Sequence, residues 1–163
     1  MTLEEMQPSD WPAVRSIYQE GIETLLATFE RSAPEWDAWD TGHLQAPRVV
    51  ARDDGVVLGW AALSPVSDRC AYGGVAEVSV YVAAAARGRG LGKALLNELV
   101  VRSEARGIWT LQAGLFAENR PSVALHLACG FREVGVRKRL GKLGGRWRDV
   151  LLMERRSSVA GVD

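Results

Sequence analysis

Residues 75–93 combine a strand pattern, a glycine-rich basic loop and the start of a helix. They read Val75-Ala76-Glu77-Val78-Ser79-Val80-Tyr81-Val82, Ala83-Ala84-Ala85-Ala86, and Arg87-Gly88-Arg89-Gly90-Leu91-Gly92-Lys93. The first part alternates and is rich in β-branched residues, which predicts a strand. Leucines at helical spacing follow the loop and predict a helix to about Arg106, ended by Gly107. The stretch therefore predicts a strand, a loop and a helix in direct succession.

This loop has the features of an anion site. Glycines let backbone N–H groups approach a ligand, and a helix N-terminus adds unpaired donors and partial positive charge. The spacing does not give Gly-x-Gly-x-x-Gly, and Ala94 follows Lys93 where a nucleotide P-loop has Ser or Thr. The dinucleotide and P-loop interpretations are thus excluded. Another phosphate-binding loop and a solvated basic turn both stay open.

The rest of the chain predicts one α/β domain over residues 1–156, with a frayed tail at 157–163. We expect a mixed central sheet of about six to seven strands flanked by about four helices. The acidic, tryptophan-rich run 35–40 is expected to be a loop leading into a second short helix. Whether Trp36 and Trp39 in it line a pocket or only pack is left open. The expected helices are 10–26, 91–106 and 121–129; the expected strands are 48–52, 56–63, 75–82, 109–116, 131–140 and 147–154.

Composition restricts the function. Of 163 residues, twenty are basic and twenty acidic, so no overall field favours nucleic acid or an anionic membrane. The first residues lack a signal-peptide pattern, and no apolar run approaches the ~18 residues of a membrane span. With two histidines and two cysteines at no metal-type spacing, we expect no metal site. These features predict a cytoplasmic protein.

Eight segments in order resemble the GCN5-related N-acetyltransferase (GNAT) superfamily, and within it the phosphinothricin and methionine sulfoximine N-acetyltransferase branch. The loop matches the superfamily's coenzyme A motif, Arg/Gln-x-x-Gly-x-Gly. The other segments are 22–24 with 27–29, 69–72, 77–82, 118–122, 125–126, 130–131 and 145–150. The resemblance covers about Leu3 to Arg156. It implies an acetyl-CoA-dependent enzyme, and a homodimer because that branch is commonly dimeric.

The resemblance also implies roles for single positions. The backbone of Val80, Tyr81 and Val82 would pair with the pantetheine arm. Asn119 would hydrogen-bond the pantetheine. The pyrophosphate would be held by the loop residues Arg87, Gly88, Arg89, Gly90, Leu91, Gly92 and Lys93. Phe29, Arg69 and Tyr72 would border the acceptor pocket.

Glu77 is the candidate general base. An amine attacks a thioester only as the free base, and a positioned carboxylate can remove its proton. Strand alternation places Glu77, Ser79 and Tyr81 on one face. The alternative is that Glu77 pairs with an arginine on a solvated face. His126 matches the position where many relatives have a tyrosine thought to protonate the departing thiolate, but it can equally be a packed helix residue.

The expected reaction is direct transfer, in a ternary complex, to the α-amine of an amino-acid-like acceptor. Arg69 is the expected carboxylate anchor, since its planar fork can bind both oxygens; a loop arginine in water is the alternative. Two other functions stay open. One is a GNAT enzyme acting on a protein N-terminus, a polyamine or an aminoglycoside; the other is a non-catalytic acetyl-CoA-binding module.

Overall fold

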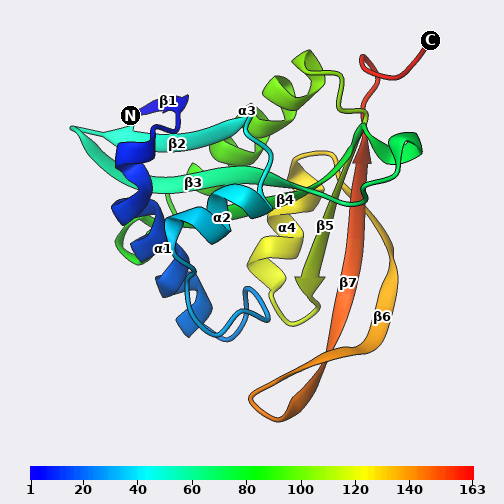
Figure 1. The fold of residues 1–163 in the computed structure, drawn as a ribbon. Helices are drawn as coiled ribbons and strands as arrows, with labels where there is room; N and C mark the ends of the chain where they lie inside the picture. The colour runs from blue at the N-terminus through cyan, green and yellow to red at the C-terminus, as the bar shows by residue number, and fades with distance from the viewer.

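The computed structural model describes Met1 to Asp163 as one seven-stranded mixed sheet with four α-helices, which confirms the predicted fold class (Figure 1). The strand order is β1-β2-β3-β4-β5-β7-β6. The strands are β1 (Thr2–Glu5), β2 (Arg48–Asp53), β3 (Val56–Pro65), β4 (Val75–Val82), β5 (Thr110–Phe116), β6 (Arg132–Leu143) and β7 (Arg146–Arg156). The α-helices are α1 (Trp11–Glu23), α2 (Trp36–Gly42), α3 (Leu91–Ala105) and α4 (Arg120–Ala128).

The sheet is antiparallel except for one pair. β4 and β5 are parallel, and α3 connects them. A parallel pair needs such a crossover, whereas the remaining neighbours pair antiparallel. The glycine-rich loop lies at the carboxyl end of β4, where this crossover begins.

Two apolar layers cover the sheet. On one face, α3 buries Leu95, Leu96 and Leu99 against β2 to β5, together with Val78 of β4. On the other face, α1 and α2 pack Trp11 and Trp39 against Trp60 and Tyr81. Alternate residues of β4 therefore enter different layers, with Val78 on the α3 side and Tyr81 on the α1 side.

Three local predictions need correction. Helix α2 begins at Trp36 itself, so the run 35–40 is mainly helix. Spacing three apart puts Trp36 and Trp39 on one face, where their rings stack at 5.9 Å between centroids. Trp39 is only 1% exposed, so it packs in the core.

Strand β1 was missed, and β6 continues to Leu143 through two register shifts.

The end of the chain contacts the domain. The N–H of Ser157 donates to the carbonyl oxygen of Trp109 at 2.8 Å, and Ser157 Oγ accepts from the N–H groups of Val159 and Ala160. Both Ser157 and Ala160 are buried. None of the helices has the length and the apolar composition that a membrane span requires.

Candidate active site

The parallel strands β4 and β5 separate to form a wedge. They pair only where Val75 to Glu77 meet Thr110 to Gln112. From Val78 to Val82 the β4 edge on that side has no strand partner, while β5 continues along β7 (Figure 1). Unpaired strand edges offer N–H and C=O groups to an extended ligand. The edge that includes Val80, Tyr81 and Val82 can therefore hold an amide-bearing chain.

The glycine-rich loop beside the wedge is a cradle of free donors. None of the six backbone N–H groups from Gly88 to Lys93 donates to another group of the chain; Ala94 N–H, bonded to Gly90 O at 3.1 Å, is the first that does. Gly88 and Gly90 have φ of 77° and 79°, which glycine adopts without strain. Leu91 is buried and takes part only through its backbone. Six free N–H groups at a helix N-terminus fit a pyrophosphate.

Basic side chains surround this cradle. Arg87, Arg89 and Lys93 are all exposed. Arg87 Nε donates to Val82 O at 3.4 Å, and Arg89 lies 3.8 Å from Asp53 in an exposed ion pair. Exposed pairs of this length contribute little and exchange readily. All three cations are thus free to contact an anion at the loop.

Glu77 lies at the apex of the wedge. Its Oε1 accepts a hydrogen bond from Gln112 Nε2 at 3.2 Å, and no arginine pairs with it. A Cβ at Gly114 would lie 3.8 Å from the same oxygen and 3.3 Å from Val150 Cγ1. Glycine inside a strand often marks a place that a ligand approaches closely. The missing side chain at Gly114 therefore leaves room beside the carboxylate.

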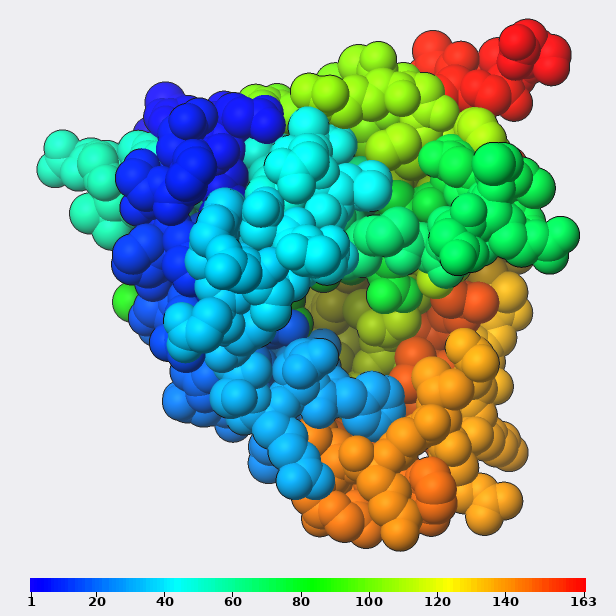
Figure 2. Space-filling model, viewed as in Figure 1, coloured from blue at the N-terminus to red at the C-terminus, as the bar shows by residue number.

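A recess opens on the face that carries Glu77. Figure 2 shows β5 at its floor, bordered by the blue segment around 25–35, cyan α2, the green loop 66–74 and the orange β6–β7 hairpin. Phe29 packs edge-on against Phe116 of β5, with 4.9 Å between ring centroids. Arg148 of β7 places its guanidinium 4.0 Å from the centre of the Phe116 ring. This end of the recess is therefore aromatic and cationic.

Arg69 and Tyr72 lie together on the loop between β3 and β4. The Arg69 guanidinium is 5.5 Å from the centre of the Tyr72 ring, and both residues are exposed. No hydrogen bond or ring contact joins them to Glu77 or Phe29. The loop 66–74 that carries both residues borders the recess across from the segment around 25–35 (Figure 2).

The side chains of Asn119 and His126 form hydrogen bonds within the protein. Asn119 caps α4 by accepting from Ser122 N–H at 3.3 Å, and its Nδ2 donates to Leu26 O at 3.0 Å. His126 is buried, packs edge-on against Phe131 and donates from Nδ1 to Ser122 O at 2.7 Å. Burial lowers the pKa of His126, which keeps the imidazole neutral near neutral pH. Of the two roles open to His126, these contacts favour packing.

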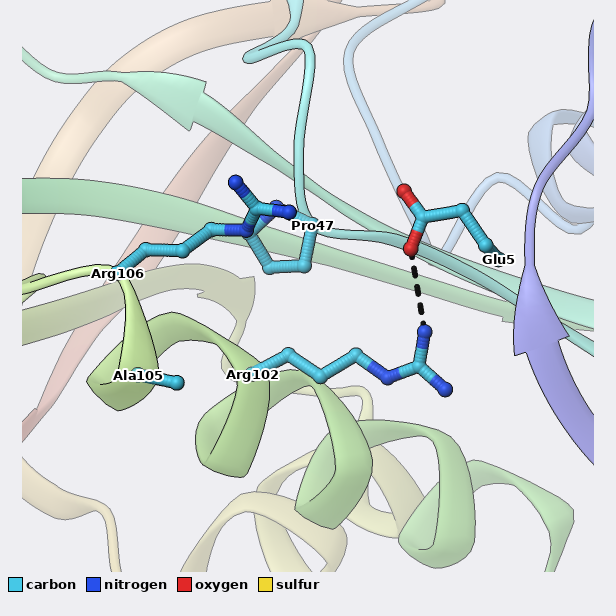
Figure 3. Close-up of a pocket in the computed structure, with 5 residues that line it drawn as sticks. All are labelled: Glu5, Pro47, Arg102, Ala105 and Arg106. Atoms are coloured by element: carbon cyan, nitrogen blue, oxygen red, sulfur yellow. Dashed lines mark hydrogen bonds and ion pairs between the residues drawn. The ribbon is translucent and has the colours of Figure 1, made fainter.

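A second depression lies at the other end of α3 (Figure 3). It has a volume of about 430 Å³ and is lined by Glu5, Pro47, Arg102, Ala105 and Arg106. The Arg102 guanidinium lies 3.2 Å from Glu5 and 2.7 Å from Glu98. A helix of fifteen residues is about 22 Å long, so this depression is remote from the cradle. Glu5 and Arg102 are paired with each other, and Arg106 forms no ion pair. Because of its distance from the cradle, the depression takes no part in the site.

A protein-family model matches the part of the chain that contains the wedge, the cradle and Glu77. Residues 8–131 fit the model of the acetyltransferase (GNAT) family. The chain belongs to this family. It is therefore an N-acetyltransferase whose co-substrate is acetyl-CoA, and the free donors at residues 88–93 fit the pyrophosphate of that molecule. No cluster of three or more His, Cys, Asp or Glu side chains is arranged to hold a metal ion.

Known proteins place the chain in the branch that the sequence predicts. It is 38% identical over 161 residues to a phosphinothricin N-acetyltransferase of Alcaligenes faecalis, covering 94% of this chain and 81% of the relative. It is 33% identical over 152 residues to an L-methionine sulfoximine/L-methionine sulfone acetyltransferase of Pseudomonas aeruginosa, covering 90% and 88%. A phosphinothricin acetyltransferase from Sinorhizobium meliloti, solved in complex with acetyl-CoA, superposes with a TM-score of 0.89. Identity to it is 35%, over 99% of this chain and 91% of that one.

Sequence reasoning missed Gln112 and Gly114 as members of the site. The signal was present in β5, where Thr110, Gln112, Gly114 and Phe116 alternate with the apolar residues Leu111, Ala113 and Leu115. That alternation predicts a second, more polar face. Only the register shows that this face continues the one carrying Glu77.

Proposed function

We propose that the enzyme acetylates the α-amine of a small, anionic amino-acid-like acceptor of the phosphinothricin or methionine sulfoximine type. The observation that carries this proposal is the position of Glu77. Its carboxylate lies where β4 and β5 separate, between the open strand edge and the recess over β5. A donor held along the edge and an acceptor held in the recess would meet beside it.

The residues divide the chemistry between them. Acetyl-CoA supplies an acetyl group activated as a thioester. The donors of residues 88–93 hold its pyrophosphate, with Arg87, Arg89 and Lys93 adding charge. The N–H groups of the Val80–Val82 edge orient the pantetheine arm and donate to the thioester carbonyl oxygen as negative charge develops there. Glu77 accepts the proton that the acceptor ammonium must lose before the nitrogen attacks.

Neither cysteine is suited to carry the acetyl group. Cys70 lies in the exposed turn Cys70–Tyr72 and makes no hydrogen bond to Glu77. Cys129 is buried at the end of α4, and burial raises the pKa of its thiol. A protonated thiol is a poor nucleophile. We therefore propose direct transfer within a ternary complex, so the enzyme incubated with acetyl-CoA alone should show no covalent acetyl adduct by intact mass.

The acceptor is proposed from charge and from the named relatives. Arg69 forms no ion pair, whereas Arg148 is paired with Glu118 at 3.5 Å. Arg69 therefore supplies the unpaired cation that would suit a carboxylate or phosphinate and disfavour polycations. Phe29 and Tyr72 would line the aliphatic part of the acceptor. We also propose that the enzyme is a cytoplasmic homodimer that does not bind nucleic acid. The equal numbers of basic and acidic residues support the last point, and light scattering of the pure protein tests the dimer.

An acceptor panel tests the proposal. Thiol release from acetyl-CoA is measured with L-phosphinothricin, L-methionine sulfoximine, L-methionine sulfone, spermidine, an aminoglycoside and a peptide beginning with alanine. We expect the three amino-acid analogues to give the highest kcat/KM. Highest turnover of spermidine or of the peptide would overturn the acceptor class. Glu77→Gln should lower kcat by about 10²- to 10⁴-fold while acetyl-CoA still binds; wild-type kcat in this variant would remove Glu77 as the base.

A further inference from the structure

Gln112 makes the only hydrogen bond that the chain gives to the Glu77 carboxylate. The two residues are 35 positions apart in sequence, and their side chains meet because they form the last register pair of β4 and β5. Gln112 Nε2 donates to Oε1 of Glu77 at 3.2 Å. The second oxygen of Glu77 has no partner in the chain. One oxygen is thus held, and the other is available to an acceptor.

The charged groups around this pair are already engaged with one another. Glu154 of β7 is in register with Gln112 on its other side. Its carboxylate is paired with Arg132 of β6 and, at 3.3 Å, with Arg156. On β3, the residue in register with Glu77 is the neutral Ser64. Gln112 is therefore the residue that fixes the Glu77 side chain, and no cation of the chain pairs with the Glu77 carboxylate.

We propose that Gln112 is a positioning residue that acts through Glu77, a role that rests on the proposed function of Glu77 as the base. A glutamate side chain has several rotatable bonds, and a base must lie within hydrogen-bond reach of the proton it takes. Fixing one oxygen from a rigid strand restricts those rotations. A neutral amide does so without the strong ion pair that an arginine would form, and such a pair would compete with the acceptor ammonium.

Gly114 leaves space for an acceptor beside the carboxylate that Gln112 holds. It follows Gln112 by two positions on β5 and lies on the same face, with space beside the held carboxylate. Gln112 therefore fixes Glu77 on the side of the wedge apex, and Gly114 leaves the next position along β5 open. The acceptor amine would enter from the Gly114 side.

A double-mutant cycle tests the role of Gln112. Gln112→Met keeps an unbranched side chain of similar length but removes the donor. With the panel acceptor of highest kcat/KM, we expect kcat to fall about 10- to 100-fold, as loss of a hydrogen bond to a charged group predicts. The dissociation constant of acetyl-CoA should stay unchanged. In a Glu77→Gln background, Gln112→Met should cost little more, because residues that act as one unit are not additive.

Thr110→Val is the matched control. It removes a hydrogen bond from the same face of β5, where Thr110 Oγ1 accepts from Arg156 Nε at 3.2 Å without touching Glu77. Its effect should be equal in both backgrounds. An additive loss for Gln112→Met, or unchanged kcat, would overturn the positioning role alone. Wild-type kcat in Glu77→Gln would overturn the base assignment and this inference together. If Gln112→Met does not fold, as judged by acetyl-CoA binding, Gln112→Ala enters the same cycle with the same expectations.

Discussion

The guanidinium of Arg148 donates from Nη1 to the backbone carbonyl oxygen of Leu25 at 2.9 Å. This bond joins β7 to the segment that follows α1, where Leu25 has a φ of 59°. The same guanidinium lies over the Phe116 ring and 3.5 Å from Glu118, and the side chain is 12% exposed. Arg148 thereby holds the segment that carries Phe29 against the end of β5. One wall of the recess depends on a cation from the last hairpin.

Arg148→Met should loosen that wall. Methionine keeps much of the packing on Phe116 but loses both polar contacts, which we expect to destabilise the fold by about 1–3 kcal/mol. The KM for the best panel acceptor should rise about tenfold, while the KM for acetyl-CoA stays close to wild type. Steady-state kinetics and urea unfolding measure the two effects. Arg146→Met is the control, because Arg146 is an exposed neighbour with no ion pair or hydrogen bond from its side chain. Equal rises in both KM values would show that Arg148 does not act on the acceptor side.

Gly114→Ala should obstruct the acceptor more than the donor. The added Cβ would lie 3.3 Å from Val150 Cγ1, a contact that a small shift can relieve, and 3.8 Å from Glu77 Oε1. It would occupy the space beside the carboxylate, so we expect the acceptor KM to rise at least about threefold, close to 0.6 kcal/mol. Gly135→Ala is the matched control on β6, where an added Cβ meets nothing within 4 Å. An unchanged acceptor KM in Gly114→Ala would place the acceptor elsewhere.

The donor half of the site could be predicted because it is local. Strand, loop and helix follow one another within residues 75–93, so alternation, glycines and leucine spacing are enough to place them. The register of β4 against β5 is different. It depends on how segments on either side of a fifteen-residue helix pair, and it alone brings Gln112 to Glu77. Strand β1 was missed because four edge residues carry too short a pattern.

The acceptor half was predicted only as a set of bordering segments. Phe29 lies against Phe116, and sequence could not show that Arg148 crosses from β7 to hold the segment that carries Phe29. Arg69 was favoured for its planar fork, and the structure places it in the open with its guanidinium on Tyr72. A side chain's chemistry can be read from sequence, whereas its partner depends on tertiary packing.

Gly90→Ala should weaken acetyl-CoA binding through the loop itself. Gly90 has a φ of 79°, so alanine there costs about 1 kcal/mol of backbone strain. The chain leaves the space around its would-be Cβ empty, which is where the pyrophosphate would approach. Gly107→Ala is the matched control, with the same φ and the same empty surroundings at the far end of α3. Both variants should lose similar stability, but only Gly90→Ala should raise the acetyl-CoA dissociation constant, by about tenfold or more. Equal dissociation constants, measured by calorimetry, would contradict the cradle.

His126 should make the fold less stable in mild acid. Burial holds its pKa below the ordinary value of 6.5, so the unfolded chain binds a proton more readily than the folded one. The contribution of His126 is therefore complete above about pH 6.5 and is lost as the pH falls from there toward the lower folded pKa. The half-buried His43 has a pKa shifted the same way and adds to the decline.

His126→Phe removes the share of the decline that belongs to His126. It keeps an aromatic ring against Phe131 but cannot be protonated, so its Tm should fall less than that of the wild type between about pH 8 and about pH 5. His43 contributes to the decline that remains, and His43→Phe is the matched variant for its share. If His126 packs and does not donate a proton, kcat in His126→Phe should stay within about threefold of wild type, whereas loss of a general acid costs about 10²-fold or more. A kcat loss of that size with an unchanged Tm profile would instead make His126 the proton donor.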